Sequence, residues 1–269
     1  MQQVDVTERV WKRLLAVKAG NAQLSPVDWT KGEEQSLTLY GDLAAQSDDI
    51  LVFAQIGQSL DGRIATETGD AQDISGKDGL AHLHRLRALA DVVVIGVKTA
   101  LQDNPRLTVR LADGQSPARV VIDPDGRLPN TAQLLHDGSV RRIVIQTVEQ
   151  ERPTGVETIT LSRSDWICPK AIIAALVGHG FKRILIEGGG ITIAQFLQAD
   201  LLNRLHIAVA PLLIGSGPQS LTTSPVGELA AARRPDTKVY DLGSDILFDC
   251  LLTTKTPVPE IGDLSALDA

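Results

Sequence analysis

RILIEGGGITIAQFL, residues 183–197, is the stretch that decides the fold. It begins with an apolar run at 184–186, typical of a buried strand, and three glycines follow at 188–190. From Ile191 onward the apolar spacing is helical. A strand that ends in glycines and leads into a helix presents free backbone N–H groups and the positive end of a helix dipole at one spot. The pattern predicts a phosphate or pyrophosphate site, although similar glycine turns also serve as plain connections.

The glycine spacing narrows the type of site. It differs from G-x-G-x-x-G, and no P-loop lysine follows, which excludes an ordinary Rossmann fingerprint and a P-loop. Glu187 ends the strand, and ligands of open α/β sheets bind at that end of the strands.

The composition of the whole chain excludes several classes of function. The 269 residues carry a formal net charge of −7 with no basic tract, which argues against nucleic acid as a main partner. Cys168 and Cys250 have no paired spacing, so we expect a reducing cytoplasm and no metal site. The N-terminus lacks the apolar core of a signal peptide, and no apolar run reaches the roughly 18 residues of a membrane span.

Two further strands end near glycines and polar side chains. The apolar strand predicted at 50–56 leads to Gly57 and a turn with Ser59 and Asp61, and the strand at 91–96 ends at Gly96 before a helical turn. Two strand-to-glycine edges in one sheet favour a dinucleotide over a single phosphate. Two arginines follow at 106 and 110. They could bind a phosphate in bidentate fashion, or they could be ordinary solvent-exposed surface residues.

Strands and helices alternate through the middle of the chain, which predicts an α/β fold with a mainly parallel sheet. Further strands are expected at 119–122, 142–146, 156–161 and 205–210, and helices at 77–90 and 170–178. Segments 237–242 and 246–254 predict an antiparallel C-terminal hairpin. Residues 1–49 are expected to form a helical appendage, with one helix capped by Thr7 and then a polar stretch to Asp49, and residues 255–269 a tail.

Six sequence motifs, taken in their order along the chain, resemble those of a known enzyme family. SLDGRIAT at 59–66, RLRA at 85–88, VIGVKTALQDNPRLTVR at 94–110, ARVVID at 118–123, ILIEGGGITIAQFL at 184–197 and LHIAVAPLLIGSG at 205–217 occur in that order. Together they resemble the reductase (pyrimidine reductase) domain of riboflavin biosynthesis. The resemblance covers about residues 50–254, and the motifs of the zinc deaminase domain that often accompanies this reductase are absent.

The resemblance implies a dihydrofolate reductase-like, three-layer α/β/α fold and a homodimer. It also implies an NADPH-dependent reduction of the ribosyl group of 5-amino-6-(5-phosphoribosylamino)uracil to a ribityl group. The implied NADPH-binding residues are Gly57, Gly96, Thr99, Asp103, Gly188, Gly189, Gly190, Ile191 and Thr192. The implied substrate-binding residues, with the arginines on the phosphate, are Gln55, Ser59, Asp61, Arg87, Leu107, Arg110 and Glu187.

Four positions depart from the family pattern. Gln55 replaces a common Lys, Ala71 a substrate-binding Ser, Pro124 a Ser that often touches the cofactor, and Asp73 a Trp or Arg. No Tyr-x-x-x-Lys pair is present, so the sequence names no general acid. Two alternatives therefore stay open: a reductase of the same fold that acts on another small heterocycle or carbonyl compound, and a nucleotide-binding module without turnover.

Overall fold

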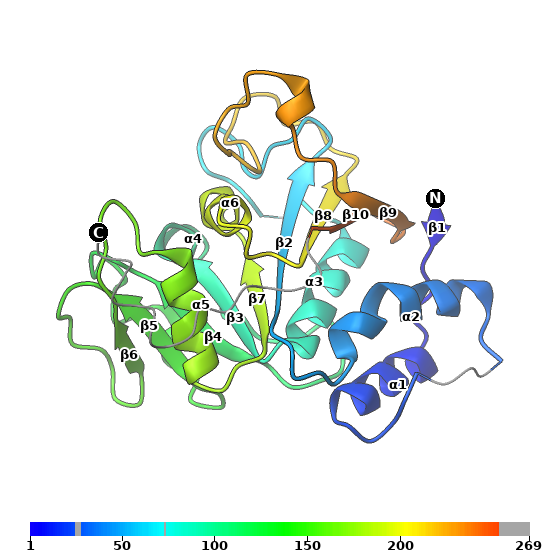
Figure 1. Ribbon diagram of the computed structural model, residues 1–269, viewed down its shortest axis with the longest axis horizontal. Coiled ribbons are helices and arrows are strands. Elements are labelled where there is room, and N and C mark those ends of the chain that lie inside the picture. The colour runs from blue at the N-terminus through cyan, green and yellow to red at the C-terminus, as the bar shows by residue number, and fades with distance from the viewer. Residues whose placement is uncertain (25–27, 73, 253–269) are drawn as a thin grey trace.

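The fold is built on one large twisted sheet. The computed structural model describes residues 1–24, 28–72 and 74–252, and within them the sheet has ten strands in the order β1-β9-β10-β8-β2-β7-β3-β4-β5-β6 (Figure 1). The strands are β1 (Gln2–Gln3), β2 (Leu51–Ser59), β3 (Val92–Gly96), β4 (Ala118–Ile122), β5 (Arg142–Gln146), β6 (Glu157–Thr160), β7 (Arg183–Glu187), β8 (Arg204–Ala210), β9 (Asp236–Asp241) and β10 (Ile246–Leu251).

The predicted strand directions are confirmed. Strands β8, β2, β7, β3, β4, β5 and β6 pair in parallel, whereas β10 runs antiparallel to both β8 and β9. The central strands β2 and β7 are apolar on both faces because helices cover both sides of a parallel sheet. Their carboxyl ends therefore meet at one edge, where the site is expected.

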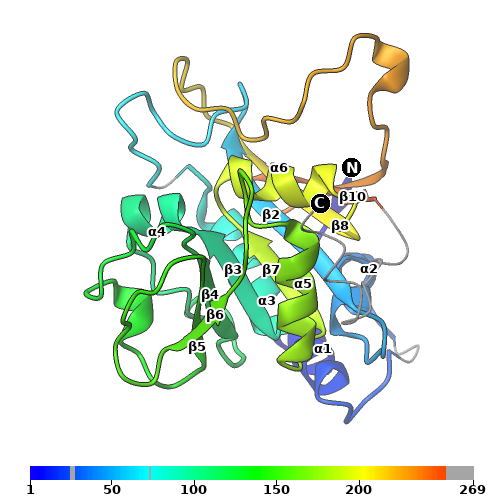
Figure 2. The ribbon, with the colours of Figure 1, turned by 60° about the vertical axis from the view of Figure 1, so that its left-hand side comes forward.

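Helices pack on both faces and give the predicted three layers (Figure 2). They are α1 (Glu8–Lys18), α2 (Lys31–Ala44), α3 (Lys77–Leu89), α4 (Val97–Asp103), α5 (Pro169–Gly178) and α6 (Gly190–Gln198). One core cluster joins a sheet face to α1, α2, α3 and α4, and the other joins the opposite face to α5 and α6. The two clusters explain why the apolar runs in these strands do not alternate with polar residues.

The N-terminal segment contains more structure than expected. Thr7 caps α1 as predicted, but the polar stretch that follows contains the missed helix α2. Thr30 and Glu33 form a capping box at its start, and this T-x-x-E spacing was the available signal. Strand β1 was also missed, because two residues carry no periodicity. It pairs with β9, so residues before 50 contribute to the sheet.

A buried polar chain connects α2 to the sheet. The Tyr40 hydroxyl lies 2.7 Å from His82 Nδ1, and His82 Nε2 lies 3.1 Å from His206 Nδ1. On the other side, His206 Nε2 lies 3.2 Å from Asp249 Oδ1, and Asp249 accepts two hydrogen bonds of 2.7 Å from Arg204. Both imidazoles are fully buried, and burial lowers the pKa of each below its ordinary value. Both histidines are therefore neutral in the folded protein at neutral pH.

We expect these histidines to make the fold sensitive to mild acid. The pKa of His84 is also lowered, to about 4, by burial and then by Arg87 and Arg110. Below the unfolded pKa of about 6.5 the unfolded chain binds protons that the folded chain does not, so stability falls as the pH drops. Urea denaturation should show a loss of about 1–3 kcal/mol between pH 7.5 and pH 5.5. A smaller loss is expected for His84→Asn, whose amide oxygen can still accept a hydrogen bond, and an unchanged midpoint in the wild type would contradict the account.

Candidate active site

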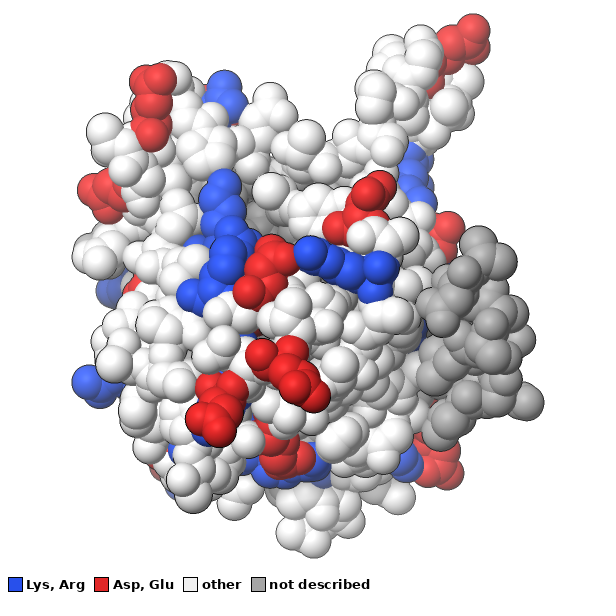
Figure 3. Space-filling model, turned by 90° about the vertical axis from the view of Figure 1, so that its left-hand side faces the viewer, with Lys and Arg blue, Asp and Glu red and all other residues white. Residues whose placement is uncertain are grey.

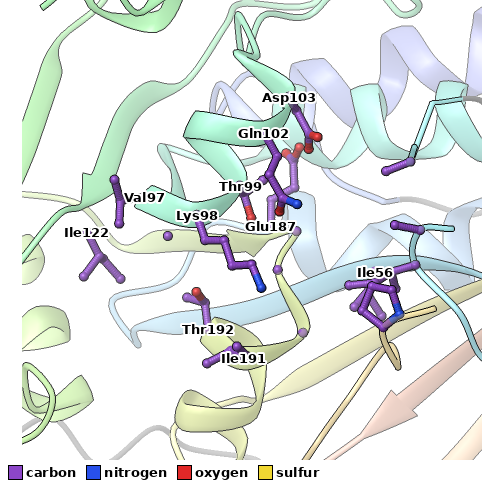
Figure 4. Close-up of a pocket in the computed structure, with 18 of the residues that line it drawn as sticks. Ile56, Val97, Lys98, Thr99, Gln102, Asp103, Ile122, Glu187, Ile191 and Thr192 are labelled. Atoms are coloured by element: carbon purple, nitrogen blue, oxygen red, sulfur yellow. The ribbon is translucent and has the colours of Figure 1, made fainter. Parts of the chain in front are cut away.

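A cavity of about 850 Å³ opens at the carboxyl ends of β2, β7, β3 and β4 (Figure 4). Gln55 and Gly57 of β2, Glu187 of β7, Gly96 of β3 and Ile122 of β4 all contribute to its wall. This volume lies in the range of small-molecule and cofactor sites, and the position is the usual one for a ligand of an open α/β sheet. The predicted edges of separate strands thus converge on one space.

The glycine loop between β7 and α6 forms one wall. Gly189 has φ +54°, and a Cβ there would lie 2.7 Å from Thr99 Oγ1, while a Cβ on Gly190 would lie 1.7 Å from the carbonyl oxygen of Ser220. The glycines are therefore required by the packing of the chain itself as well as by the turn. Residues 188–192 line the cavity, so the unpaired N–H groups of the first turn of α6 are available to an anion. A pyrophosphate fits this wall.

Helix α4 forms the wall next to the glycine loop, against which Thr99 packs. Thr99 and Asp103 line the cavity from this helix, and burial together with the nearby Glu187 raises the pKa of Asp103. Lys98 also lines it, and Figure 4 shows its side chain extending toward Ile191 and Thr192 at the start of α6. Sequence reasoning missed Lys98, because a single lysine beside a strand end has no distinctive spacing. It adds a positive charge beside the predicted pyrophosphate site.

Glu187 and Arg87 form a buried ion pair. Arg87 donates from Nε to Glu187 Oε2 at 2.8 Å and from Nη2 to Glu187 Oε1, and it donates from Nη1 to the Thr108 carbonyl oxygen at 3.0 Å. The exposed fractions of the two side chains are 7% and 10%. Glu187 lines the cavity and Arg87 does not. Through this contact Arg87 orients the Glu187 carboxylate. A direct phosphate contact by Arg87 stays a prediction.

The other predicted arginine, Arg110, lies outside the cavity lining together with Leu107. The Arg110 backbone N–H donates to His84 Nδ1 at 2.8 Å, and its guanidinium donates to Thr108 Oγ1 at 2.6 Å. Leu107 has φ +54° and is 1% exposed, so its side chain belongs to the core. The guanidinium of Arg110 is exposed at the surface. Substrate contacts by Leu107 and Arg110 stay predictions.

Ser59 and Asp61 serve the loop that follows β8. Ser59 Oγ donates to Asp61 at 2.5 Å, and the Asp61 carboxylate accepts from the backbone N–H groups of Ile214 at 3.1 Å and Gly215 at 2.6 Å. These hydrogen bonds, with the one from Ser59 the largest cause, lower the pKa of Asp61 to about 2. Neither residue lines the cavity, but Gln219, further along the same loop, does. The pair holds a segment of the wall in place.

Three of the four residues that depart from the family pattern line the cavity. Gln55, Ala71 and Pro124 all line it, whereas Asp73 lies outside the described residues. The structure adds an apolar wall that includes Leu80 and Leu83 of α3, two leucines on the helix that the sequence predicted at 77–90. Spacing alone cannot tell a core from a cavity wall.

Charged side chains also surround the cavity at the β4 end. Figure 3 views the side of the molecule where β5 and β6 lie, and shows Lys and Arg gathered with carboxylates around a hollow in the surface.

Among the residues that the structure describes, no cluster of His, Cys, Asp and Glu could hold a metal ion. No helix within the described ranges is long and apolar enough to cross a membrane.

A family model and a curated relative both match most of this chain. The model of the RibD C-terminal domain matches residues 50–248. The 2,5-diamino-6-ribosylamino-4(3H)-pyrimidinone 5′-phosphate reductase of Methanothermobacter thermautotrophicus is 30% identical over 208 residues, which cover 74% of this chain and 96% of that protein.

Two solved structures share the architecture. The deaminase/5-amino-6-(5-phosphoribosylamino)uracil reductase of Thermotoga maritima superposes with a TM-score of 0.68 at 22% identity, covering 89% of this chain and 74% of that one. RibD of Acinetobacter baumannii gives 0.67 at 25% identity, covering 82% of this chain and 64% of that one. At such identities the Thermotoga structure supports the fold alone, and that fold is the predicted one.

Proposed function

This chain belongs to the RibD C-terminal domain family, and from that membership and the cavity we propose that it is an NADPH-dependent reductase of a phosphorylated ribosylamino-pyrimidine. The reaction would convert the ribosyl group to a ribityl group. The observation that carries the proposal is that two adjoining elements line one cavity: the glycine loop with the start of α6, and α4 with Thr99 and Lys98. A dinucleotide needs both an anion cradle and an elongated cavity, and this edge of the sheet offers both.

The cofactor, when bound, supplies the hydride, and the chain supplies binding and orientation. In this proposal the N–H groups at the start of α6 and the Lys98 ammonium bind the pyrophosphate. The hydroxyl of Thr99 and the carboxyl of Asp103 lie on the adjoining wall formed by α4, where the ribose and nicotinamide portions are expected. These groups form a local positive site for the pyrophosphate within a chain whose net charge is −7.

The substrate occupies the β2 end of the cavity in this proposal. Gln55 and Glu187 are register partners on neighbouring strands, so the amide and the carboxylate lie next to each other. Arg87 fixes the carboxylate, which can accept hydrogen bonds from ribose hydroxyls or pyrimidine N–H groups. Leu80 and Leu83 exclude water from the same region. Gln55 can donate and accept hydrogen bonds but cannot supply the proton that the reduction consumes.

The relatives leave two pyrimidines as candidate substrates. The resemblance in sequence favours the deaminated compound, 5-amino-6-(5-phosphoribosylamino)uracil. The Methanothermobacter protein, of which the chain covers 96%, is named for a pyrimidinone that still carries its 2-amino group. A nucleotide-binding module without turnover is the third alternative, because Gln55 replaces a charged residue. The two substrates differ at one exocyclic group, so one assay compares them.

We expect NADPH oxidation, followed at 340 nm, with at least one of the two pyrimidines. If the site holds its substrate by hydrogen bonds to the 2-position, the preferred compound should react with a kcat/KM at least about tenfold higher. Oxidation only with other carbonyl compounds would support the same-fold alternative. Binding of NADPH without oxidation of any substrate would contradict the proposed function and support the non-catalytic module.

We further propose a homodimer in the cytoplasm, as the family resemblance implies. The segment between β8 and β9, residues 211–235, carries Leu213, Val226 and Leu229, whose exposed fractions are 71%, 51% and 78%. Apolar side chains of this size are candidates for a subunit contact. Light scattering should give twice the chain mass of 28.8 kDa, and the mass of a single chain would exclude the dimer under those conditions.

A further inference from the structure

The order of the strands gives the cavity a direction. Its wall passes from β2 through β7 and β3 to β4, and neighbouring strands lie about 4.8 Å apart, so the two ends are separated by roughly 14 Å. If the glycine loop on β7 binds the pyrophosphate, the substrate and nicotinamide lie toward β2 and the adenosine lies toward β4. The residues at the β4 end are then the ones that meet the adenosine half of the cofactor.

Two arginines and a carboxylate occupy this end. Arg163 Nη2 lies 2.6 Å from Asp125 Oδ1, and Arg127 Nε lies 3.7 Å from Asp125 Oδ2. All three line the cavity, and their side chains remain 34%, 56% and 43% exposed for Arg163, Arg127 and Asp125. One carboxylate cannot use all the donors of two guanidinium groups, which carry five N–H each. Donors therefore remain for a second anion.

The turn that carries Arg127 is fixed from below. Asp123 is fully buried and accepts from the backbone N–H groups of Arg127 and Leu128, each at 2.9 Å. Arg152 neutralises this carboxylate at 2.7 Å, and both side chains are inaccessible. The backbone from which the Arg127 side chain departs is thus held by buried charge-assisted hydrogen bonds. A fixed backbone lowers the entropic cost of placing a guanidinium against a ligand.

An aromatic surface lies beside the arginines. Trp166 lines the cavity and is 58% exposed, and Ile122 and Pro124 line the same end. Aromatic rings such as this indole stack on nucleobases. The remaining charged groups that line this part of the cavity are Lys98 and Asp165. Lys98 extends toward the start of α6 and is assigned to the pyrophosphate, so two arginines and two carboxylates remain at this end.

We propose that Arg127 and Arg163 bind the 2′-phosphate of NADPH, with Trp166 stacked on the adenine, and that this pair makes the enzyme select NADPH over NADH. The inference rests on the proposed function, because it takes the position of the pyrophosphate from it. Asp125 holds the two guanidinium groups together rather than accepting a hydrogen bond from the ribose. A phosphate matches the paired arginine donors, whereas the 2′-hydroxyl of NADH leaves them without an anion.

Calorimetric titration with 2′,5′-ADP and with ADP tests the proposal without turnover. The wild type should bind 2′,5′-ADP at least about 30-fold more tightly, since charge-assisted hydrogen bonds of this strength change affinity by such factors. The double variant Arg127→Ala/Arg163→Ala should lose most of the difference, and Arg127→Lys/Arg163→Lys should keep part of it. Arg141→Ala is the matched control, because this exposed arginine is paired with Glu157 at the amino-terminal ends of β5 and β6, away from the cavity at the carboxyl ends of the strands.

The outcomes separate this proposal from the one on which it rests. Equal affinity of the wild type for the two nucleotides, or an unchanged preference in the double alanine variant, would overturn the arginine site and leave a nicotinamide-dependent reductase standing. If the wild type binds neither these nucleotides nor NADPH, the proposed function fails and this inference fails with it. Tighter binding of NADH than of NADPH would assign Asp125 to the ribose and reverse the proposal.

Discussion

Gly189→Val is expected to raise the dissociation constant for NADPH by roughly a hundredfold or more. The new side chain would begin 2.7 Å from Thr99 Oγ1 and push the loop away from α4, which separates the two walls of the cavity. The loss of two charge-assisted hydrogen bonds from the loop, each about 1.5–3 kcal/mol, is enough for an effect of this size. Quenching of protein fluorescence by NADPH measures the change directly.

Gly180→Val provides the control for backbone strain. Gly180 also has a positive φ, +90°, but a Cβ there meets nothing within 4 Å, and the residue precedes β7 rather than following it. Both variants force a β-branched residue into the left-handed region at about 1–2 kcal/mol. Only Gly189→Val should lose cofactor affinity. An unaltered NADPH affinity in that variant would show that the glycine loop is only a turn.

Arg87→Ala is expected to lower the free energy of unfolding by about 3–5 kcal/mol, because it leaves the Glu187 carboxylate buried without its partner. The two side chains are nearly inaccessible, so water cannot replace the guanidinium. The folded fraction that remains should show a substrate KM raised far more than the NADPH KM, since Glu187 faces the β2 end of the cavity. Chemical denaturation and steady-state kinetics provide the two measurements.

Arg233→Ala serves as the comparison for Arg87→Ala. Arg233 pairs with Asp200 at 2.6 Å, but the side chains are 51% and 70% exposed, so the loss should stay below about 1 kcal/mol. Equal losses in the two variants would mean that the pair at the cavity is solvated in solution. Equal increases in both KM values of Arg87→Ala would contradict the division of the cavity into a substrate end and a cofactor end.

The sequence predicted the parts of the fold that depend on local pattern. The apolar runs in β2, β3 and β7 each specify a strand buried on both faces, and the glycines after β7 mark its turn into α6. Strands with such patterns have few alternatives in a chain that alternates them with helices. The convergence of Gly57, Gly96 and the glycine loop on one cavity then follows from parallel pairing alone, which is why this cavity wall was accessible to prediction.

The rest of the site depends on long-range contacts that carry no local pattern. Arg87 belongs to a helix and Glu187 to a strand one hundred residues later, so nothing near either residue shows that they neutralise each other. Arg127 and Arg163 are connected only through their common partner Asp125 among the contacts of the described residues. The helix α2 was hidden for another reason: its surface is polar, and its buried residues pack on α1 and α3 rather than forming a long apolar stripe.

The pairing of β1 with β9 has a consequence for how the chain can be divided. The family match begins at residue 50, but β9 borders β1 on its outer side, and Tyr40 covers the imidazole of His82. A chain cut at the start of the match would uncover the hydrogen-bonding edge of β9 and leave a buried histidine facing solvent. Open strand edges promote association between chains. The smallest piece that folds by itself is therefore expected to be longer than the piece that evolution shares among these relatives.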